Sequence, residues 1–353
     1  MGNFKIDSSY VKHPKQDGEV NVFINREAAE CKDCFSTSRK VIFVNGMQNS
    51  GKDHAESALA LSLVQMCPVI GVYNATDGFW MDLAQCIGDK NQFQGFSKSA
   101  TNTAASAKAQ AEAQALAQAR RVKILAALSR NKAQVSLFNL LNVPENRNYE
   151  IFAHSQGNLI VSNVLQAIAA LEGSESLRGR TVHTFGSPAV HYPKELQLFE
   201  HGYTFDPVNW LSGIDFSMSI SKVGMPTGSK NPITHGFLWY MQDDPRFVIN
   251  RFRTGGWGMT FNMDEEGLAA CLARMGTNMP RVKKVMAYLD AHHNSDADDV
   301  ALAYVHRIKH DSSIVAALRT HKDLVHLLIK TMDEGWTSGS EKEAINWLKT
   351  LAK

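Results

Sequence analysis

The sequence predicts an α/β protein, a mostly parallel sheet flanked by helices, with an all-helical region at its C-terminal end. Three observations lead to this prediction. Short apolar runs alternate with helical segments over residues 39–256, an order typical of parallel sheets covered on both faces. One of these runs turns sharply into a helix at a serine. Over residues 257–353, helical segments follow one another without any strand pattern.

The composition is that of an ordinary globular protein. Hydrophobic residues make up 44% of the 353 residues, and the net charge of +2 argues neither for nor against a polyanionic partner, so we expect no nucleic-acid partner. No run reaches the roughly 20 apolar residues of a membrane span, and the polar N-terminus lacks the apolar core of a secretory signal. We therefore expect a cytoplasmic location in the producing cell.

The use of cysteine agrees with that location. Five scattered cysteines, an odd number, fit a reducing compartment. The pair Cys31-x-x-Cys34 could form half a zinc site or a redox pair, but no second pair at metal-ligand spacing follows it. We expect two ordinary thiols there, and we expect neither a metal nor a cofactor in this protein.

The first elements are predicted from apolar runs rich in β-branched residues. Residues 1–38 are expected to form an irregular leader that contains one strand at Val20–Ile24. The first strong core strand is Lys40–Val44. The elements expected after it are a helix at His54–Met66, a second strand at Pro68–Tyr73 and a short amphipathic helix at Phe79–Ile87.

Residues 101–131 have an unusual composition. Alanine occupies every odd position from Ala105 to Ala119. A period of two would suggest a strand, but alanine and its glutamine and glutamate neighbours favour helix, so we predict one long helix. We favour a crossover helix packed on the sheet, and the alternative is a lid over an apolar cleft.

The later elements first continue the alternation of strands and helices, and from about residue 257 only helices are expected. A helix at Asn158–Leu171 and a strand at Thr181–Phe185 complete the predicted sheet region. The C-terminal helices are expected at Glu265–Met275, Arg281–His292, Asp298–Lys309, Ser312–Met332 and Glu341–Leu351, the fourth with a break near Thr320.

The segment Tyr149–Val161 reads as a short apolar strand, a sharp turn and the start of a helix, with Ser155 at the turn. Ala153 and Gly157 flank this serine two positions away, and both are small enough for strand and helix to pass closely. The pattern departs from the nucleophile elbow Gly-x-Ser-x-Gly by one methyl group. The alternative role for Ser155 is an N-cap on a buried helix.

A serine nucleophile needs a base to take its proton and an acid to orient that base. Asp206 ends the apolar run Gly202–Phe205, and the proline after it stops the strand. His235 lies in a loop that leads into the aromatic helix Phe237–Met241. The order serine, acid, histidine, with each residue at the end of an element, indicates a triad of Ser155, Asp206 and His235.

Other acids and histidines fit this order less well. Asp215 lies in a looser sequence context, and Asp243 and Asp244 follow His235 in the chain. The side chain of His154 is expected to point away from the elbow, His183 lies inside a predicted strand, and His201 precedes the acid.

These motifs together resemble a bacterial serine lipase of the α/β-hydrolase superfamily, over about residues 40–250. The Phe-Gly-Ser-Pro run is similar to one that follows the nucleophile helix in class 3 lipases. The matching segments are Ala153–Gly157, Phe185–Ala189, Asp206–Val208 and His235–Phe237. The resemblance implies an α/β-hydrolase-like sheet and an enzyme that hydrolyses carboxylic esters of lipids. It also implies phospholipids as substrates and peripheral contact with a membrane.

The layout of a signal-less lipase core with a helical C-terminal addition also resembles the phospholipase effectors delivered by bacterial type VI secretion. That resemblance implies an antibacterial toxin exported by a signal-independent system, with an immunity or delivery protein as its partner. The residues of the C-terminal helices do not choose among such partners.

The loop after the first core strand has two interpretations. Gly46–Lys52 fits the phosphate-loop spacing G-x-x-x-x-G-K, but Asp53 stands where that motif has the magnesium ligand Ser or Thr. In α/β-hydrolases the loop after an early strand supplies half of the oxyanion hole. We favour this second interpretation, in which the donors are backbone N–H groups of Gln156 and of Gly46 or Met47.

Two rival functions remain beside the esterase. One is a nucleotide-binding protein that uses the phosphate-loop spacing of Gly46–Lys52. The other is a non-catalytic hydrolase-like module whose C-terminal helices bind a partner.

Overall fold

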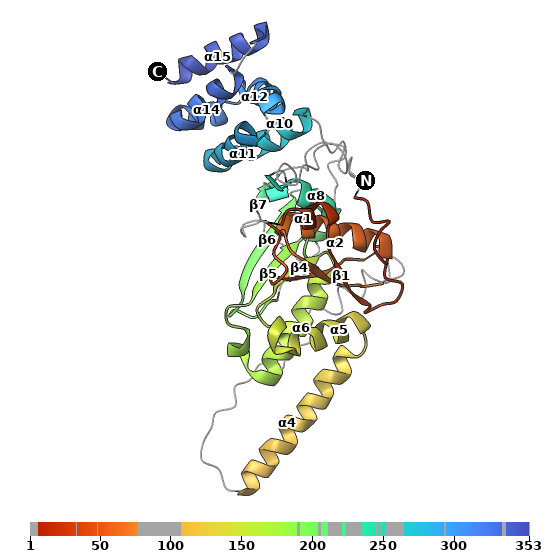
Figure 1. Cartoon of the computed structure of the whole chain (residues 1–353). Helices are drawn as coiled ribbons and strands as arrows, with labels where there is room; N and C mark the ends of the chain where they lie inside the picture. The colour runs from red at the N-terminus through yellow and green to blue at the C-terminus, as the bar shows by residue number, and fades with distance from the viewer. Residues whose placement is uncertain are drawn as a thin grey trace.

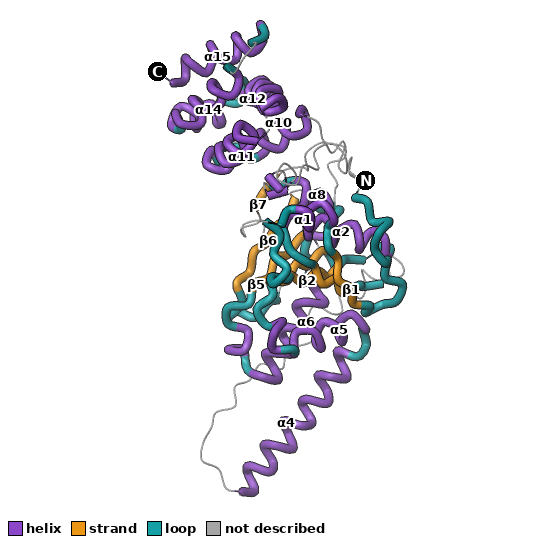
Figure 2. The backbone as a smooth tube through the Cα atoms, viewed as in Figure 1, coloured by secondary structure: helices purple, strands orange, loops and turns teal. Residues whose placement is uncertain are grey.

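The computed structural model describes residues 6–32, 34–47, 49–75, 107–188, 191–203, 206–210, 221–223, 235–244, 246–247, 249–250, 265–292, 294–333 and 337–352. Within these residues the chain forms a seven-stranded sheet with helices on both faces, and an array of helices at the C-terminal end (Figures 1 and 2). The predicted α/β class and the helical C-terminal region are confirmed at this level.

The sheet is mostly parallel. Its strands, in spatial order, are β1 (Val20–Phe23), β3 (Val69–Val72), β2 (Val41–Val44), β4 (Glu150–His154), β5 (Thr181–Phe185), β6 (Gln197–Tyr203) and β7 (Ser221–Val223). Each neighbouring pair is parallel except β1 with β3, which is antiparallel. The carboxyl ends of β2, β4, β5 and β6 therefore lie at one edge of the sheet, and the residues that follow these strands meet there.

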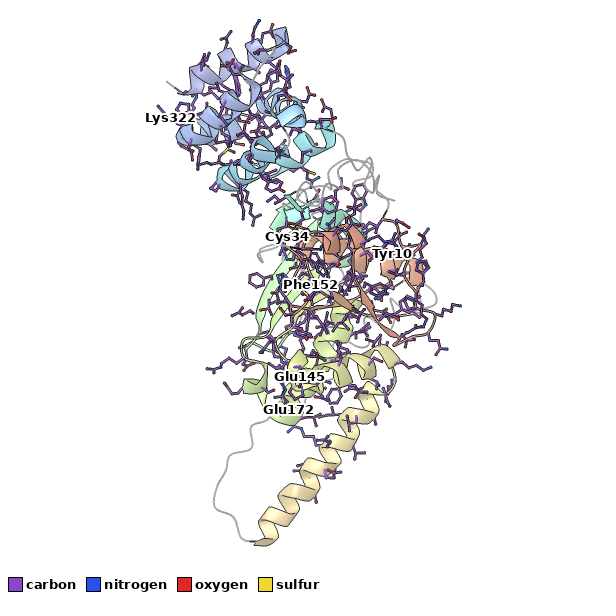
Figure 3. All side chains as sticks on the ribbon, in the orientation of Figure 1. Tyr10, Cys34, Glu145, Phe152, Glu172 and Lys322 are labelled. Carbon is purple, nitrogen blue, oxygen red and sulfur yellow. A yellow bond between two sulfur atoms is a disulfide. The ribbon has the colours of Figure 1, made fainter. Side chains whose placement is uncertain are left out.

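The sheet separates two hydrophobic cores. Val41 and Phe43 of β2 face the core that contains α2 (Gly51–Gln65) and α8 (Phe237–Gln242). The alternating residues Ile42 and Val44 face the other core, which contains α5 (Lys132–Asn142) and α6 (Gly157–Glu172). Because both faces are covered, every residue of β2 is buried and the strand reads as an unbroken apolar run. Figure 3 shows Phe152 of β4 inside this packed region.

Helix α2 starts three residues before its predicted start. Ser50 is its N-cap, and the Ser50 hydroxyl accepts the Asp53 N–H at 3.2 Å. The Asp53 carboxylate in turn accepts the Ser50 N–H at 2.9 Å, which completes a capping box. These two contacts satisfy backbone donors at the helix N-terminus and fix where the loop after β2 ends.

The strand predicted within residues 1–38 is confirmed as β1, but this segment is less irregular than the sequence predicts. β1 is an edge strand of the sheet, and α1 (Arg26–Glu30) packs beside α2. Cys31 and Cys34 are joined by a disulfide with a Cα–Cα distance of 5.5 Å, so the expectation of two ordinary thiols is wrong. A Cβ at Gly51 would collide with the Pro14 carbonyl, so the first residues also press on the start of α2.

Helix α4 (Ala107–Leu128) projects from the protein as a long single rod (Figure 1). The predicted helix is confirmed over these residues, but the favoured crossover helix packed on the sheet is wrong for most of them. Ile124 and Leu128 are buried near its C-terminal end, whereas Leu116 is 72% exposed. The lid stays a prediction, and residues 101–106 and the helix expected at Phe79–Ile87 lie outside the described residues.

The C-terminal helices form a layered array whose buried residues join the core on the α2 and α8 side of the sheet. Their bounds are α10 (Glu265–Arg274), α11 (Met279–His292), α12 (Asn294–Ile308), α13 (Ser312–Thr320), α14 (Lys322–Met332) and α15 (Gly339–Ala352). The predicted break near Thr320 is confirmed. Arg274 of α10 contacts Asp243 after α8 at 3.4 Å, which ties the array to the sheet region. The boundary expected at residue 257 lies outside the described residues.

The shorter helical elements connect these larger ones. They are the 3₁₀ turns at Pro144–Asn146 and Ser174–Leu177 and the short helix α7 (Pro207–Trp210). The strand expected at residues 202–205 begins earlier, since β6 covers Gln197–Tyr203.

The exposure of α4 can be tested with a matched pair of leucines. Leu61 of α2 is fully buried, so we expect Leu61→Ala to lower the free energy of unfolding by about 2–5 kcal/mol. The same change at Leu116 should alter it by less than about 0.5 kcal/mol, because that side chain has little to lose. Urea unfolding followed by circular dichroism measures both. Equal losses would mean that α4 packs against the protein.

Candidate active site

Ser155 stands at the sharp corner between β4 and α6. Its φ is +54°, a left-handed conformation that is uncommon outside glycine and that clusters at functional sites. The Ser155 N–H donates to the Phe185 carbonyl at 2.9 Å, and the Asn158 side chain donates to the Ser155 carbonyl at 2.9 Å. These contacts hold the corner from both sides, as a nucleophile elbow requires.

Two glycines let other backbone segments approach the elbow. A Cβ at Gly157 would collide with the Val44 carbonyl, so the start of α6 passes directly against the end of β2. A Cβ at Gly46 would collide with the Ser155 side chain. The loop after β2 therefore lies directly over the Ser155 hydroxyl, where the predicted oxyanion donors would have to be.

Asp206 and His235 form a buried pair. His235 Nδ1 lies 2.8 Å from both carboxylate oxygens of Asp206, whose residue is fully buried. The carboxylate also accepts the Val208 N–H at 2.9 Å and the Tyr240 hydroxyl at 3.0 Å. The acid and the histidine chosen from the sequence are thus brought together, and the acid is further held by two donors that the sequence did not indicate.

The surroundings of Asp206 keep it charged. Burial acts to raise the pKa of this carboxyl, but the hydrogen bond and charge of His235 and the Val208 N–H outweigh burial, and the pKa lies below its ordinary value. Burial and the Asp206 charge raise the pKa of Tyr240 well above its ordinary value. The Tyr240 hydroxyl therefore stays protonated and donates to the carboxylate.

The imidazole of His235 lies beside the elbow. His154, which precedes Ser155, bonds the His235 carbonyl through its Nε2 at 2.6 Å, and the two rings stack with centroids 4.6 Å apart. A Cβ at Gly186, the residue after the Phe185 carbonyl that holds Ser155, would lie 2.8 Å from His235 Cε1. His235 and Ser155 therefore share two neighbouring segments, one at His154 and one at Phe185–Gly186.

Ser155 Oγ and His235 Nε2 are both buried, and neither makes a hydrogen bond in this structure. The third contact of a triad is therefore absent here, although the two atoms that would form it are both uncommitted. Hydrogen bonds of this kind are often long in structures without substrate and shorten when substrate binds.

His154 contacts the backbone of His235 through a neutral ring. Burial, with the nearby charge of His235, lowers the pKa of His154 to about 3, so the ring is neutral near pH 7. Its Nε2–H must donate, because the partner is a carbonyl. His154 therefore fixes the backbone of His235.

Buried side-chain amides link the loop after β2 to Gln156, the residue that follows Ser155. The Asn45 side chain donates to the Gly46 carbonyl at 2.8 Å and also accepts the Asn74 N–H at 2.8 Å. The Asn74 side chain donates to Gln156 Oε1 at 2.8 Å. Both proposed oxyanion segments are therefore held by one hydrogen-bonded network. Its two asparagines follow adjacent parallel strands, β2 and β3, which is the signal that could have identified them.

The remaining sequence candidates have other partners or lie outside the described residues. Asp243 accepts the Tyr203 hydroxyl at 2.8 Å, and Asp244 pairs with Arg246 at 2.7 Å. His183 and His201 line a different cavity. Asp215 lies outside the described residues.

The geometry of Gly46–Lys52 leaves little room for a phosphate. The Asp53 carboxylate occupies the N-terminus of α2, where a phosphate loop would hold its anion. Lys52 lies 3.7 Å from the Glu56 carboxylate. Over the described residues, no group of three His, Cys, Asp or Glu side chains could hold a metal ion, and no helix is long and apolar enough to cross a membrane.

The chain matches no protein-family model, no curated protein and no solved structure. Function is therefore argued from the geometry of this site and from the motifs in the sequence.

The close approach at Gly186 can be tested against a second glycine. Gly186 and Gly179 both have positive φ, at +51° and +80°, but only Gly186 has close neighbours. Gly179→Ala should cost about 1–2 kcal/mol of stability for the left-handed backbone alone. Gly186→Ala should cost about 1–3 kcal/mol more, because its Cβ would lie 2.5 Å from the Asp206 carboxylate. Equal losses in chemical unfolding would contradict this placement of the Asp206–His235 pair.

Proposed function

We propose that this chain is a serine hydrolase of carboxylic esters with an α/β-hydrolase-like catalytic domain. Ser155 is the nucleophile, His235 the base and Asp206 the acid that orients it. The observation that carries the proposal is the left-handed φ of a buried serine on a strand-to-helix corner, beside a buried Asp206–His235 pair. A serine that only caps a helix needs neither a left-handed backbone nor a neighbouring Asp–His pair.

The chemistry is acyl transfer in two steps. Ser155 Oγ attacks the ester carbonyl carbon while His235 Nε2 takes the hydroxyl proton, and His235 then gives this proton to the departing alcohol. In the second step, His235 takes a proton from the water that attacks the acyl-serine, and it returns this proton to Ser155 Oγ as the acid product leaves. Asp206 stays ionised and stabilises the imidazolium that forms.

The charge that develops on the carbonyl oxygen would be met by backbone N–H groups of Gln156 and of Gly46 or Met47. Each such donor is typically worth about 3 kcal/mol in the barrier. The Asn45–Asn74 network supports both segments from behind, so it would hold the donors in place before the substrate arrives.

The proposed substrates are lipid esters, and phospholipids in particular. This class comes from the resemblance of the sequence motifs to serine lipases. The same resemblance suggests an antibacterial effector that touches membranes peripherally and is delivered by a secretion system, with an immunity or delivery protein bound by the C-terminal helices. The rival phosphate-loop function receives no support from a helix N-terminus that carries the Asp53 carboxylate.

The nucleophile is tested by covalent labelling. Ser155→Ala should abolish labelling by a fluorophosphonate probe and lower ester hydrolysis by about ten-thousandfold or more. Asp206→Ala and His235→Ala should also remove most activity toward a panel of fatty-acyl esters and phospholipids. Ser162→Ala is the control, because this buried serine of α6 bonds the His191 carbonyl and lies away from the elbow.

Two results would end the esterase proposal. Labelling that persists in Ser155→Ala would place the reactive group elsewhere. A folded wild-type chain that neither reacts with the probe nor hydrolyses any ester in the panel would favour the non-catalytic module.

The amide network makes a separate prediction about rate. Loss of an oxyanion donor typically costs roughly 100- to 1000-fold in kcat, and Asn74 acts one step away, so we expect Asn74→Ala to lower kcat about tenfold. KM should stay unchanged, because the lost support matters only when charge develops on the oxygen. Asn146→Ala is the control, since that amide bonds the Leu140 carbonyl at the end of α5. An equal loss in both variants would contradict a role for Asn74 in the site.

A further inference from the structure

A second cavity, separate from Ser155, lies between the sheet and the C-terminal helices. Its volume is about 430 Å³, within the range of about 300–1,000 Å³ that small-molecule sites occupy. None of Ser155, Asp206 and His235 lines it. Tyr240 belongs to both places, because its ring lines this cavity while its hydroxyl holds Asp206.

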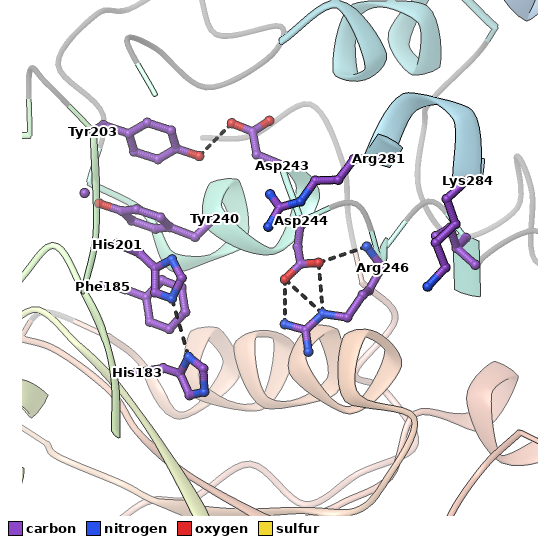
Figure 4. A pocket seen from close by; sticks show the side chains of 12 residues that line it. His183, Phe185, His201, Tyr203, Tyr240, Asp243, Asp244, Arg246, Arg281 and Lys284 are labelled. Carbon is purple, nitrogen blue, oxygen red and sulfur yellow. Dashed lines mark hydrogen bonds and ion pairs between the residues drawn. The ribbon is translucent and has the colours of Figure 1, made fainter. Parts of the chain in front are cut away.

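One wall of the cavity is aromatic. Phe185 of β5 stacks on His201 of β6 with ring centroids 4.5 Å apart, and Tyr203 lies 4.4 Å from the ring of Tyr240. Residues two apart on a strand share a face, so these rings form a continuous surface above the sheet (Figure 4). Such a surface suits a flat or apolar ligand body.

The opposite wall is basic. Arg281 and Lys284 of α11 line the cavity, and their three-residue spacing puts them on one face of the helix. Figure 4 shows both side chains across from the aromatic wall, together with Arg246. Among the described residues, neither Arg281 nor Lys284 has a carboxylate partner.

The two carboxylates of the cavity already have partners of their own. Asp244 pairs with Arg246 at 2.7 Å, and Asp243 contacts Arg274 at 3.4 Å as well as the Tyr203 hydroxyl at 2.8 Å. Two formal positive charges, those of Arg281 and Lys284, are therefore left over.

Two histidines line the cavity: His183 Nε2 lies 3.5 Å from the Glu150 carboxylate, and His201 adds no charge near neutral pH. The pKa of His201 is lowered to about 4, mainly by burial and also by the positive charges of His183, Arg246 and Arg281, which Asp244 opposes. The excess positive charge of the cavity thus belongs to Arg281 and Lys284.

We propose that this cavity binds a small phosphoryl-bearing molecule, whose dianionic group meets Arg281 and Lys284 and whose body lies on the aromatic wall. Two uncompensated cations fit a dianion better than a single carboxylate, and the arginine fork matches phosphate geometry. The phosphoryl group could belong to a soluble phosphate ester or to a lipid headgroup. This site goes beyond the proposed ester hydrolysis and does not depend on it.

The test uses the full chain with Ser155→Ala, so that no ester is consumed whether or not the hydrolase proposal holds. Inorganic phosphate and phenyl phosphate are titrated by calorimetry, and vesicles with or without phosphatidic acid are tested by co-sedimentation. Phenyl phosphate should bind more tightly than inorganic phosphate, because only it can use the aromatic wall. Binding of vesicles alone, dependent on phosphatidic acid, would assign the phosphoryl group to a lipid.

The cations are tested by charge removal on one helix. Arg281→Gln with Lys284→Gln should weaken binding of the responding probe about tenfold or more. Lys283→Gln removes the same charge from α11, but Lys283 pairs with Asp323 outside the cavity, so its effect should stay within about twofold. Thermal melting checks that each variant is folded, and Lys284→Gln alone replaces the double variant if that one is not. Absence of binding by every probe, or equal binding by the cavity and control variants, would overturn the proposal.

Discussion

The closeness of backbone segments at one edge of the sheet is the constraint on which the candidate active site depends. Gly46, Gly157 and Gly186 each occupy a place where a Cβ would collide with a neighbour, and those neighbours belong to the strand ends and to the Asp206–His235 pair. Without these approaches the loop after β2 could not cover Ser155, and α6 could not start against β2. The left-handed backbone of Ser155 is kept because the packing around it leaves no alternative.

A buried charge imposes the second condition. Asp206 is fully buried and ionised, so its lone pairs must be met by donors if the fold is to tolerate it. His235, Tyr240 and the Val208 N–H supply them from three different segments. The carboxylate therefore orders the loops around it as well as the imidazole, and one group serves both the stability of this edge and the chemistry proposed for it.

Local sequence patterns predicted the parts of the fold that local forces decide. The apolar run of β2, the strand, turn and helix around Ser155, and the break near Thr320 all arise from period, size and breaker residues close in sequence. The acid and the histidine could be chosen because parallel strands bring their carboxyl ends together. The missed features depend on contacts between distant residues: β1 joins the sheet by pairing with β3, and Asn74 after β3 reaches Gln156 after β4, past the end of the intervening β2. The alanine pattern of α4 fixes a helix, but it says nothing about what the helix lies against.

Helix α4 has few neighbours among the described residues along most of its length (Figure 1). Its 22 residues span about 33 Å at the usual rise, and most of that length lies beyond the buried contacts of Ile124 and Leu128. A helix in water with no tertiary support is only marginally stable, and alanine is the residue that best sustains it. Its outer turns should open and close on their own, exchanging amide protons with solvent while the sheet stays intact. Order in this rod is therefore set by its own composition and by temperature, independently of the rest of the chain.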